Sequence, residues 1–436
     1  MLKKNILFFL FLIIFLFLAY GLFYSYGFDY LNSMFLLIGT FVLSYLFFNK
    51  YFLKNKKIEI PVFFNEKKII NIIDVSLIFV FLFQILHYIY IGNIPIVKAI
   101  LTSDYYYIAK IRQDIKLVTN VFINYGASFI IKALLPVLIL TLFFIDKKRF
   151  WIYSIISIFY CLALMQKAYI VTLFIPLILK FLYLKKWKEF ILISTIVFSG
   201  IVFLVLVTNP SLRPFSWGEQ TLMTEKGERS NKVKYKSESA DYIEFKKSLE
   251  KKNVVIEEEE IKDSTSNPVS EVFGAIYDRV FITTGKMVGN WFFYVPDSLP
   301  YLHGNGYRFA TPFIGGKYHD YSREIYDKIY LKEASMGFTG TATTAFFMYD
   351  YANFGNFGLV LSGVYISLFL ILLKRLFKDD NENMFALNGL SIIWLTSAAF
   401  STTFFSGGWI LTLILYVLLK PVLTVNKLNL DAEKNH

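Results

Sequence analysis

Cationic side chains in unusual places are the first candidates for chemistry in this sequence. Lys167 lies in the apolar stretch LALMQKAYIV, and Lys132 lies within another apolar run. A charge inside a membrane span costs several kcal/mol unless it is paired or reaches the interface, so such residues are functional candidates by default. Arginines that could share this role flank one long polar segment: Arg213, Arg279, Arg308 and Arg323. A guanidinium is a planar fork suited to pyrophosphate, so these cations could together bind such an anion.

The two best-placed cations also have structural alternatives. Lys132 could extend its ammonium to the membrane surface, as long basic side chains do. Arg279, in AIYDRVF, could form an ordinary salt bridge within a loop. The adjacent Asp278 does not obviously neutralise it, because neighbours in a helix point in different directions.

Histidines are the candidates for acid–base chemistry, and the chain has four. His303, in LPYLHGNGYRF, lies beside glycines that allow a tight turn, and its neutral imidazole could act as a base near pH 7. His319 is a second candidate for contact with a substrate. His87 lies in an apolar run and is expected to be a hydrogen-bonded packing residue, whereas His436 belongs to the terminal tail.

Several familiar kinds of site are missing from the sequence. It contains no GxxxxGK[ST], no GxGxxG after a strand, no HExxH and no GxSxG. Cys161 is the only cysteine, so an intramolecular disulfide and a cysteine-based metal site are excluded. We therefore expect neither a metal nor a cofactor.

Composition places the chain in a membrane. Its residues are 56% hydrophobic, and the apolar ones form blocks of the length that crosses about 30 Å of hydrocarbon. The net charge of +12 is not a patch for nucleic acid. Residues 209–340 contain 18 Lys or Arg and 19 Asp or Glu, so the excess lies in short loops between apolar blocks. That distribution is typical of cytoplasmic loops.

The apolar blocks predict an all-α polytopic transmembrane bundle with about ten spans. The expected spans are residues 5–24, 30–48, 69–91, 126–145, 150–166, 168–184, 190–208, 356–373, 384–403 and 407–423. With ten spans every basic cluster falls on one side, so both termini are expected in the cytoplasm. The run 150–184 would be about 52 Å long as one helix, too long for one crossing. It must cross twice, which places Lys167 at the outer turn of a hairpin.

This topology divides the chain into four parts. Residues 1–208 hold seven spans, and residues 209–340 form a large external loop with a charged insertion at about 225–265. Residues 341–424 hold a re-entry segment and three C-terminal spans, followed by a cytoplasmic tail at 425–436. Residues 95–116 are expected to form an amphipathic external helix that lies on the membrane.

The segment after the loop, FMYDYANFGNFG, carries a resemblance to a known family. Together with the many spans and one large late loop, it resembles the bacterial O-antigen polymerases, the Wzy-type oligosaccharide repeat-unit polymerases. The resembling residues are Phe347, Tyr349, Tyr351, Asn353, Phe354, Gly355 and Gly358. The two glycines also permit close helix packing, and Tyr349 and Asp350 could contact a substrate.

The resemblance implies a metal-independent glycosyltransferase in the bacterial inner membrane. In that family a basic residue follows a short outer turn and loop arginines engage a lipid pyrophosphate, which would match Lys167 and Arg279. Lysine in place of arginine is a departure, and Asn290 stands where some members have glycine. The implied partners are undecaprenyl-pyrophosphate-linked glycan donor and acceptor, membrane lipids and a chain-length regulator protein.

The expected reaction extends a polyprenyl-pyrophosphate-linked glycan on the external face of the membrane. Arg279 and Lys167, with Arg213 or Arg308, would hold the donor pyrophosphate, and His303 would deprotonate the acceptor hydroxyl. Alternative functions are a lipid-linked glycan ligase, a transporter or flippase of lipid-linked oligosaccharide, and a non-enzymatic assembly protein.

Overall fold

The computed structural model describes residues 5–52, 65–92, 94–102, 107–108, 110–112, 115, 120–209, 219–220, 234–235, 274, 277–308, 311–335, 340–378 and 380–432. Within these ranges the regular structure is helical apart from two short strands. The strands are β1 (Glu219–Gln220) and β2 (Lys234–Tyr235), which pair antiparallel. Arg213, most of the charged insertion and His436 lie outside the described residues.

Eight helical segments in the described residues are long and apolar enough to cross a membrane. They are α1 (Ile6–Tyr26), α2 (Leu31–Tyr51), Lys67–Ile91 of α3 (Glu66–Ile91), Val121–Ile145, α9 (Lys167–Leu184), α10 (Trp187–Thr208), α18 (Asn356–Phe377) and Phe400–Leu423. The segment Val121–Ile145 joins α6 (Val121–Phe129), the π-helical η2 (Ile130–Leu134) and α7 (Leu135–Ile145). The segment Phe400–Leu423 joins α20 (Phe400–Phe404) to α21 (Trp409–Ala432). An all-α polytopic membrane protein is thus confirmed, while the count of ten spans stays a prediction.

Two of the expected spans correspond to shorter helices. The helix α8 (Lys147–Ala163) has 17 residues and α19 (Asn381–Trp394) has 14. The span expected at 384–403 is therefore not one helix, because the chain turns between Trp394 and α20. The amide of Phe346, the first residue of α17 (Phe346–Phe354), donates to the Leu395 carbonyl over 2.8 Å. This hydrogen bond connects the residue that follows α19 to the start of α17.

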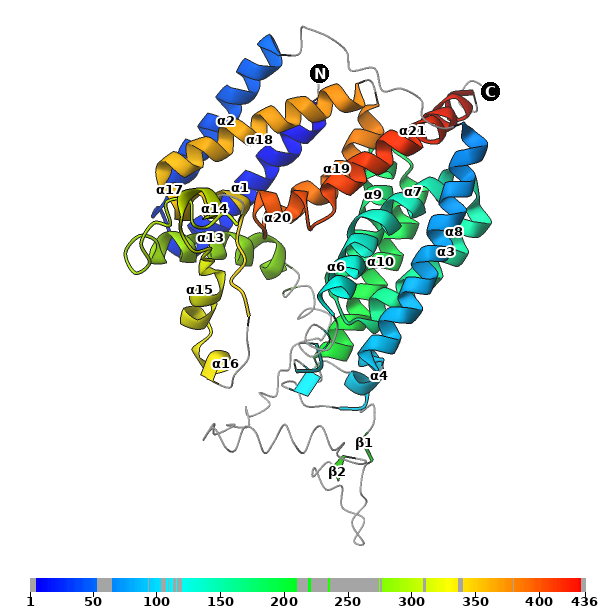
Figure 1. Cartoon of the computed structure of the whole chain (residues 1–436), viewed down its shortest axis with the longest axis horizontal. Coiled ribbons are helices and arrows are strands. Elements are labelled where there is room, and N and C mark those ends of the chain that lie inside the picture. Colours follow the sequence, from blue (N-terminus) through cyan, green and yellow to red (C-terminus); the bar gives the residue numbers. More distant parts are fainter. Residues whose placement is uncertain are drawn as a thin grey trace.

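The helices form two groups joined by α19 (Figure 1). The first group contains α1, α2, α17, α18, η4 (Asp278–Ile282) and α13 (Thr283–Tyr294), and the second contains α3 and α6 to α10. The helix α19 packs against α9 of the second group and against α1 and α18 of the first. Figure 1 shows the start of α1 and the end of α21 at one end of the molecule, with α4 (Pro95–Ile100) and α16 (Leu331–Ser335) at the other. The expected placement of both termini on one side agrees with this arrangement.

Close approach of backbones fixes part of the loop against the first group. A Cβ atom added to Gly285 of α13 would lie 2.5 Å from the Leu18 carbonyl oxygen of α1, and one added to Gly21 would lie 2.6 Å from the Phe281 carbonyl oxygen. Only glycine at these two positions lets the helices cross so closely. The segment formed by η4 and the start of α13 is thereby packed directly on α1.

The turn of the α8–α9 hairpin is made without glycine or proline. Met165 adopts a positive φ of 54°, and α9 begins at Lys167, so the expected hairpin and its turn are confirmed. A left-handed residue costs about 1–2 kcal/mol. Burial offsets this cost, because Met165 is fully buried in a small cluster with Ala99, Tyr107 and Ile108. The described part of the segment 95–116 therefore packs on this turn. Its first helix, α4 (Pro95–Ile100), ends at Ile100, so the segment is not the single helix that was expected.

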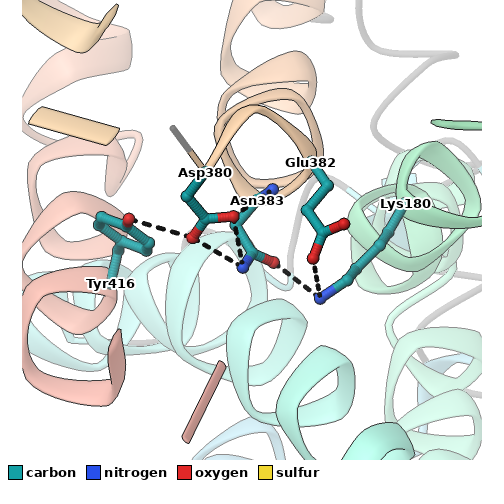
Figure 2. A network of polar contacts seen from close by, with 5 residues as sticks. All are labelled: Lys180, Asp380, Glu382, Asn383 and Tyr416. Carbon is teal, nitrogen blue, oxygen red and sulfur yellow. Dashed lines mark hydrogen bonds and ion pairs between the residues drawn. The ribbon is translucent and has the colours of Figure 1, made fainter. Parts of the chain in front are cut away.

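A buried polar network links α9, α19 and α21 (Figure 2). The Lys180 Nζ donates to Asn383 Oδ1 over 2.8 Å and lies 3.9 Å from Glu382 Oε1. The side-chain amide of Asn383 donates to both carboxylate oxygens of Asp380, over 3.1 and 2.9 Å. The Tyr416 hydroxyl also donates to Asp380, over 3.1 Å. These residues are almost fully buried. The network, which includes a lysine from the same apolar run as Lys167, therefore joins the three helices.

We expect removal of the ammonium to destabilise the protein strongly. In Lys180→Met the carboxylate of Glu382 stays buried without its cation, which typically costs about 3–5 kcal/mol. Thermal unfolding in detergent should show a clear fall in midpoint, and adding Glu382→Gln should recover part of it. Lys188→Met, at an exposed position of α10, is the matched control. An equal midpoint for Lys180→Met and this control would contradict the role assigned to the network.

Candidate functional site

A polar cavity of approximately 790 Å³ lies between the loop that precedes α17, α17 itself, α6 and the turn that separates α19 from α21. Its loop wall includes Tyr307, Arg308, Tyr318 and Asp320, and Tyr349 contributes from α17. Much of the remaining wall carries hydroxyl groups, from Ser322, Thr341, Thr343, Ser397, Ser401, Thr402 and Ser406. Hydroxyls and aromatic faces of this kind suit a sugar, and the volume lies in the usual range for ligand sites.

An apolar cavity of approximately 490 Å³ adjoins the polar one. The two share Tyr307, Tyr349, Ala399 and Ser401 as lining residues. The other residues that line the apolar cavity come from α17, α18 and α20, and they are Phe346, Asp350, Phe354, Leu361, Val364, Tyr365 and Phe400. A polar compartment therefore meets an apolar compartment at one boundary, an arrangement that fits a ligand with a polar head and an apolar tail.

One asparagine holds the loop that forms the wall of the polar cavity. The Asn353 Oδ1 accepts hydrogen bonds from the amides of Gly304 (2.9 Å) and Gly306 (3.0 Å), and its Nδ2 donates to the Tyr349 carbonyl over 2.8 Å. His303 and Gly304 adopt positive φ angles of 48° and 96°, so the turn is tight. The side-chain oxygen of Asn353 stabilises this turn because it accepts hydrogen bonds from two of its backbone amides. Asn353 thus fixes the position from which Tyr307 and Arg308 enter the cavity.

A buried carboxylate stands at the boundary of the two cavities. Asp350 accepts hydrogen bonds from the hydroxyls of Tyr307, Ser362 and Tyr365, the last over 2.7 Å. Burial raises the pKa of Asp350, and the three hydroxyl donors oppose this rise. A Cβ added to Gly358 would overlap the Asp350 carbonyl oxygen, so the close packing expected at this glycine is confirmed. Asp350 therefore ties α17, α18 and the loop together.

Three of the expected site residues meet at these cavities. Arg308 and Tyr349 line the polar cavity, and Tyr349 and Asp350 line the apolar one. The Arg308 guanidinium carbon lies 4.7 Å from the centroid of the Tyr318 ring, a cation–π contact that holds the side chain at the wall. Burial raises the pKa of the Tyr349 hydroxyl, which keeps it a hydrogen-bond donor at neutral pH.

The other expected cations lie on different elements. Lys167 is half-buried at the first turn of α9, in the second helix group, and does not line either cavity. Lys132 lies on the π-helical η2, with its Nζ 4.1 Å from the centroid of the Trp394 ring at the end of α19. Arg279 lies on the π-helical η4, which packs against α1, and its side chain is outside the described residues. Lys167 and the element that carries Arg279 belong to different helix groups, and their joint binding of one pyrophosphate stays a prediction.

The expected acid–base residues lie beside the cavities without lining them. His303 is exposed at the tight turn, with its ring against Tyr301. The His319 Nε2 lies 2.6 Å from Glu324 Oε1 in an exposed pair, and Arg323 is exposed on α15 (Tyr321–Ile329). His87 is buried and its Nδ1 is 2.6 Å from the Tyr160 hydroxyl, so its packing role is confirmed.

Asp320 and Tyr307 are functional candidates that the sequence does not mark directly. Asp320 stands between His319 and α15 and accepts from the Ser322 amide over 2.9 Å, as a helix N-cap. An acidic residue that precedes a short amphipathic stretch predicts such a cap, but not a position at a cavity. Tyr307 could have been suspected only from its place after a glycine-rich turn.

Comparison with known proteins adds no family assignment. No protein-family model, no curated protein and no solved structure matches this chain. The O-antigen polymerase resemblance therefore rests on the residues quoted above and on the architecture.

We expect Asn353→Ala to release the loop at the cavity wall. Two buried amides lose their acceptor, and each unsatisfied group typically costs about 1–3 kcal/mol. Trypsin should then cleave after Arg308 faster, which mass spectrometry of the fragments can measure. Asn356→Ala, three residues later and exposed, is the control. Equal cleavage rates in the two variants would argue against the role of Asn353.

Proposed function

We propose that this protein is a membrane glycosyltransferase that polymerises polyprenyl-pyrophosphate-linked oligosaccharide repeat units into a surface polysaccharide. The reaction would take place on the external face of the bacterial cytoplasmic membrane. The observation that supports the proposal most is the boundary between the polar and the apolar cavity. A lipid-linked glycan has the same division, because its sugars and diphosphate are polar and its isoprenoid chain is apolar.

The cation at the polar cavity fits the leaving group of this reaction. A glycosyl donor of this class releases a lipid diphosphate, whose negative charge grows as the bond to the sugar breaks. Arg308 is the one cationic residue among the described residues that line the polar cavity. It is the residue we assign to the diphosphate, a role for which the sequence also offered Lys167 and Arg279. A guanidinium can form two parallel hydrogen bonds to such a group.

A flippase of lipid-linked oligosaccharide is the second candidate function. Two observations favour it. The helical structure is interrupted between α19 and α20. In addition, the charged residues Lys180, Asp380 and Glu382 are buried at and near the start of α19. Broken helices and intramembrane charges are common in transporters. A ligase that passes the glycan to another lipid would share the donor site of the polymerase.

The test is reconstitution of the full chain in liposomes with lipid-linked repeat units of a strain that carries it. We expect products longer than one repeat unit, seen as a ladder after gel electrophoresis of the released glycans. Arg308→Ala should abolish the ladder, while Arg323→Ala, exposed on the same loop, should leave it unchanged. Transbilayer movement without elongation would indicate a flippase, and transfer to lipid A core alone a ligase.

We also expect that filling the apolar cavity weakens binding of long lipid tails. Val364→Trp places a large ring in the cavity, so the KM for a substrate with a long isoprenoid chain should rise about tenfold, equivalent to about 1.4 kcal/mol of lost binding. A short-chain substrate should be affected little. Leu372→Trp, exposed on the same helix, is the control. An equal rise for both chain lengths would exclude this cavity as the tail site.

A further inference from the structure

Asp320 is the one carboxylate among the described residues that line the polar cavity. Its backbone is extended, with φ −132° and ψ 112°, and one carboxylate oxygen caps α15 through the Ser322 amide. The side chain is half-buried. The cap fixes the carboxylate at the start of a helix, so it faces the cavity from a rigid element and not from a free loop.

Tyr318 separates this carboxylate from the cation of the same cavity. The Arg308 guanidinium lies over the Tyr318 ring, and the Tyr318 hydroxyl interacts with both charged groups. Burial raises the pKa of Tyr318, Asp320 raises it further, and Arg308 opposes the rise. Arg308 and Asp320, both in the described part of the chain, form no ion pair with each other within 4.0 Å. The cavity wall therefore carries a cation and an anion that share Tyr318 as a neighbour and form no ion pair with each other.

We propose that Asp320 is the general base of the glycosyl transfer, an inference that rests on the proposed function. The acceptor hydroxyl attacks the anomeric carbon of the donor, and the new carbon–oxygen bond forms. The bond from that carbon to the diphosphate breaks, and its electron pair leaves with the diphosphate beside Arg308. The hydroxyl proton passes to the Asp320 carboxylate. A single displacement of this kind inverts the anomeric centre, as in hydrolases that use a carboxylate base.

The other acid–base groups near the cavity fit this step less well. His303 is exposed outside the lining of both cavities, and His319 is engaged with Glu324. Asp350 lines the apolar cavity, where both of its carboxylate oxygens already accept hydrogen bonds from hydroxyls. Of the described residues, Asp320 alone combines a carboxylate with a place in the hydroxyl-rich compartment that also holds Arg308. The geometry of the cavity thus favours Asp320 over the two histidines, His303 and His319, that the sequence had suggested.

The decisive variant is Asp320→Asn in the full-length reconstituted protein. Asparagine caps helices about as well as aspartate, so α15 is retained while the base is removed. Turnover should fall by about 10²–10⁴-fold, the usual contribution of a general base, and binding of the lipid-linked donor should change by less than about twofold. Asp327→Asn, an exposed position on the same helix, makes the same change of charge and should retain wild-type turnover.

Chemical rescue separates a base from a structural residue. Glycine also caps helices well, so Asp320→Gly leaves room for an added carboxylate such as formate. Formate should restore part of its turnover and should not accelerate the wild type. Turnover of Asp320→Asn within about threefold of wild type, or loss of turnover in Asp320→Gly that formate does not restore, would overturn the assignment. A wild-type protein that binds the donor but never elongates it would instead refute the proposed function.

Discussion

Polar groups buried among apolar helices must find their partners within the protein, and this constraint organises the whole molecule. Lys180, Asn383, Asp380 and Tyr416 satisfy one another where α9, α19 and α21 meet. A hydrocarbon environment offers no water to replace a lost partner, so the alternative arrangements of these helices are strongly disfavoured. The network at one end of the α19–α21 hairpin therefore determines where the turn at its other end lies. That turn supplies the serine and threonine wall of the polar cavity.

The same constraint operates in the loop and gives it a defined shape. Asn353 satisfies the amides of the glycine-rich turn, and Asp350 accepts from a tyrosine of the loop and from two hydroxyls on α18. Both residues belong to α17, which also bonds to the end of α19 through Phe346. The α17 helix thus connects the loop that precedes it to the membrane helices. Residues far apart in sequence reach one cavity because this short helix holds each of their segments.

The sequence predicts the membrane architecture well because hydrophobic thickness acts on each segment locally. The α8–α9 hairpin follows from the length of one apolar run, and the structure makes its turn at Met165 without a glycine or proline. The break after Trp394 is different, since the residues 384–403 are apolar enough for one helix. The Ser397 hydroxyl contributes a local hydrogen bond to the Trp394 carbonyl over 3.4 Å. The contact with α17 is tertiary, because the Phe346 amide donates to the Leu395 carbonyl. For the same reason Lys180 could not be assigned its partners from the sequence.

The candidate site was predicted in part, and the failures share one cause. Residue type pointed to Lys167, His303 and His319 as well as to Arg308, whereas position at the polar cavity favours Arg308 and adds Asp320. Under the proposed function, the boundary between the polar and the apolar cavity explains why Arg308 and Asp320 are favoured. A diphosphate joins the sugar of a lipid-linked glycan to its tail, so a ligand whose tail fills the apolar cavity must place its diphosphate near Tyr307 and Tyr349, which line both compartments. A cation and a base can therefore act on the bond between sugar and diphosphate only from the polar side of that boundary. A stronger base or a second cation elsewhere on the surface would not reach this bond.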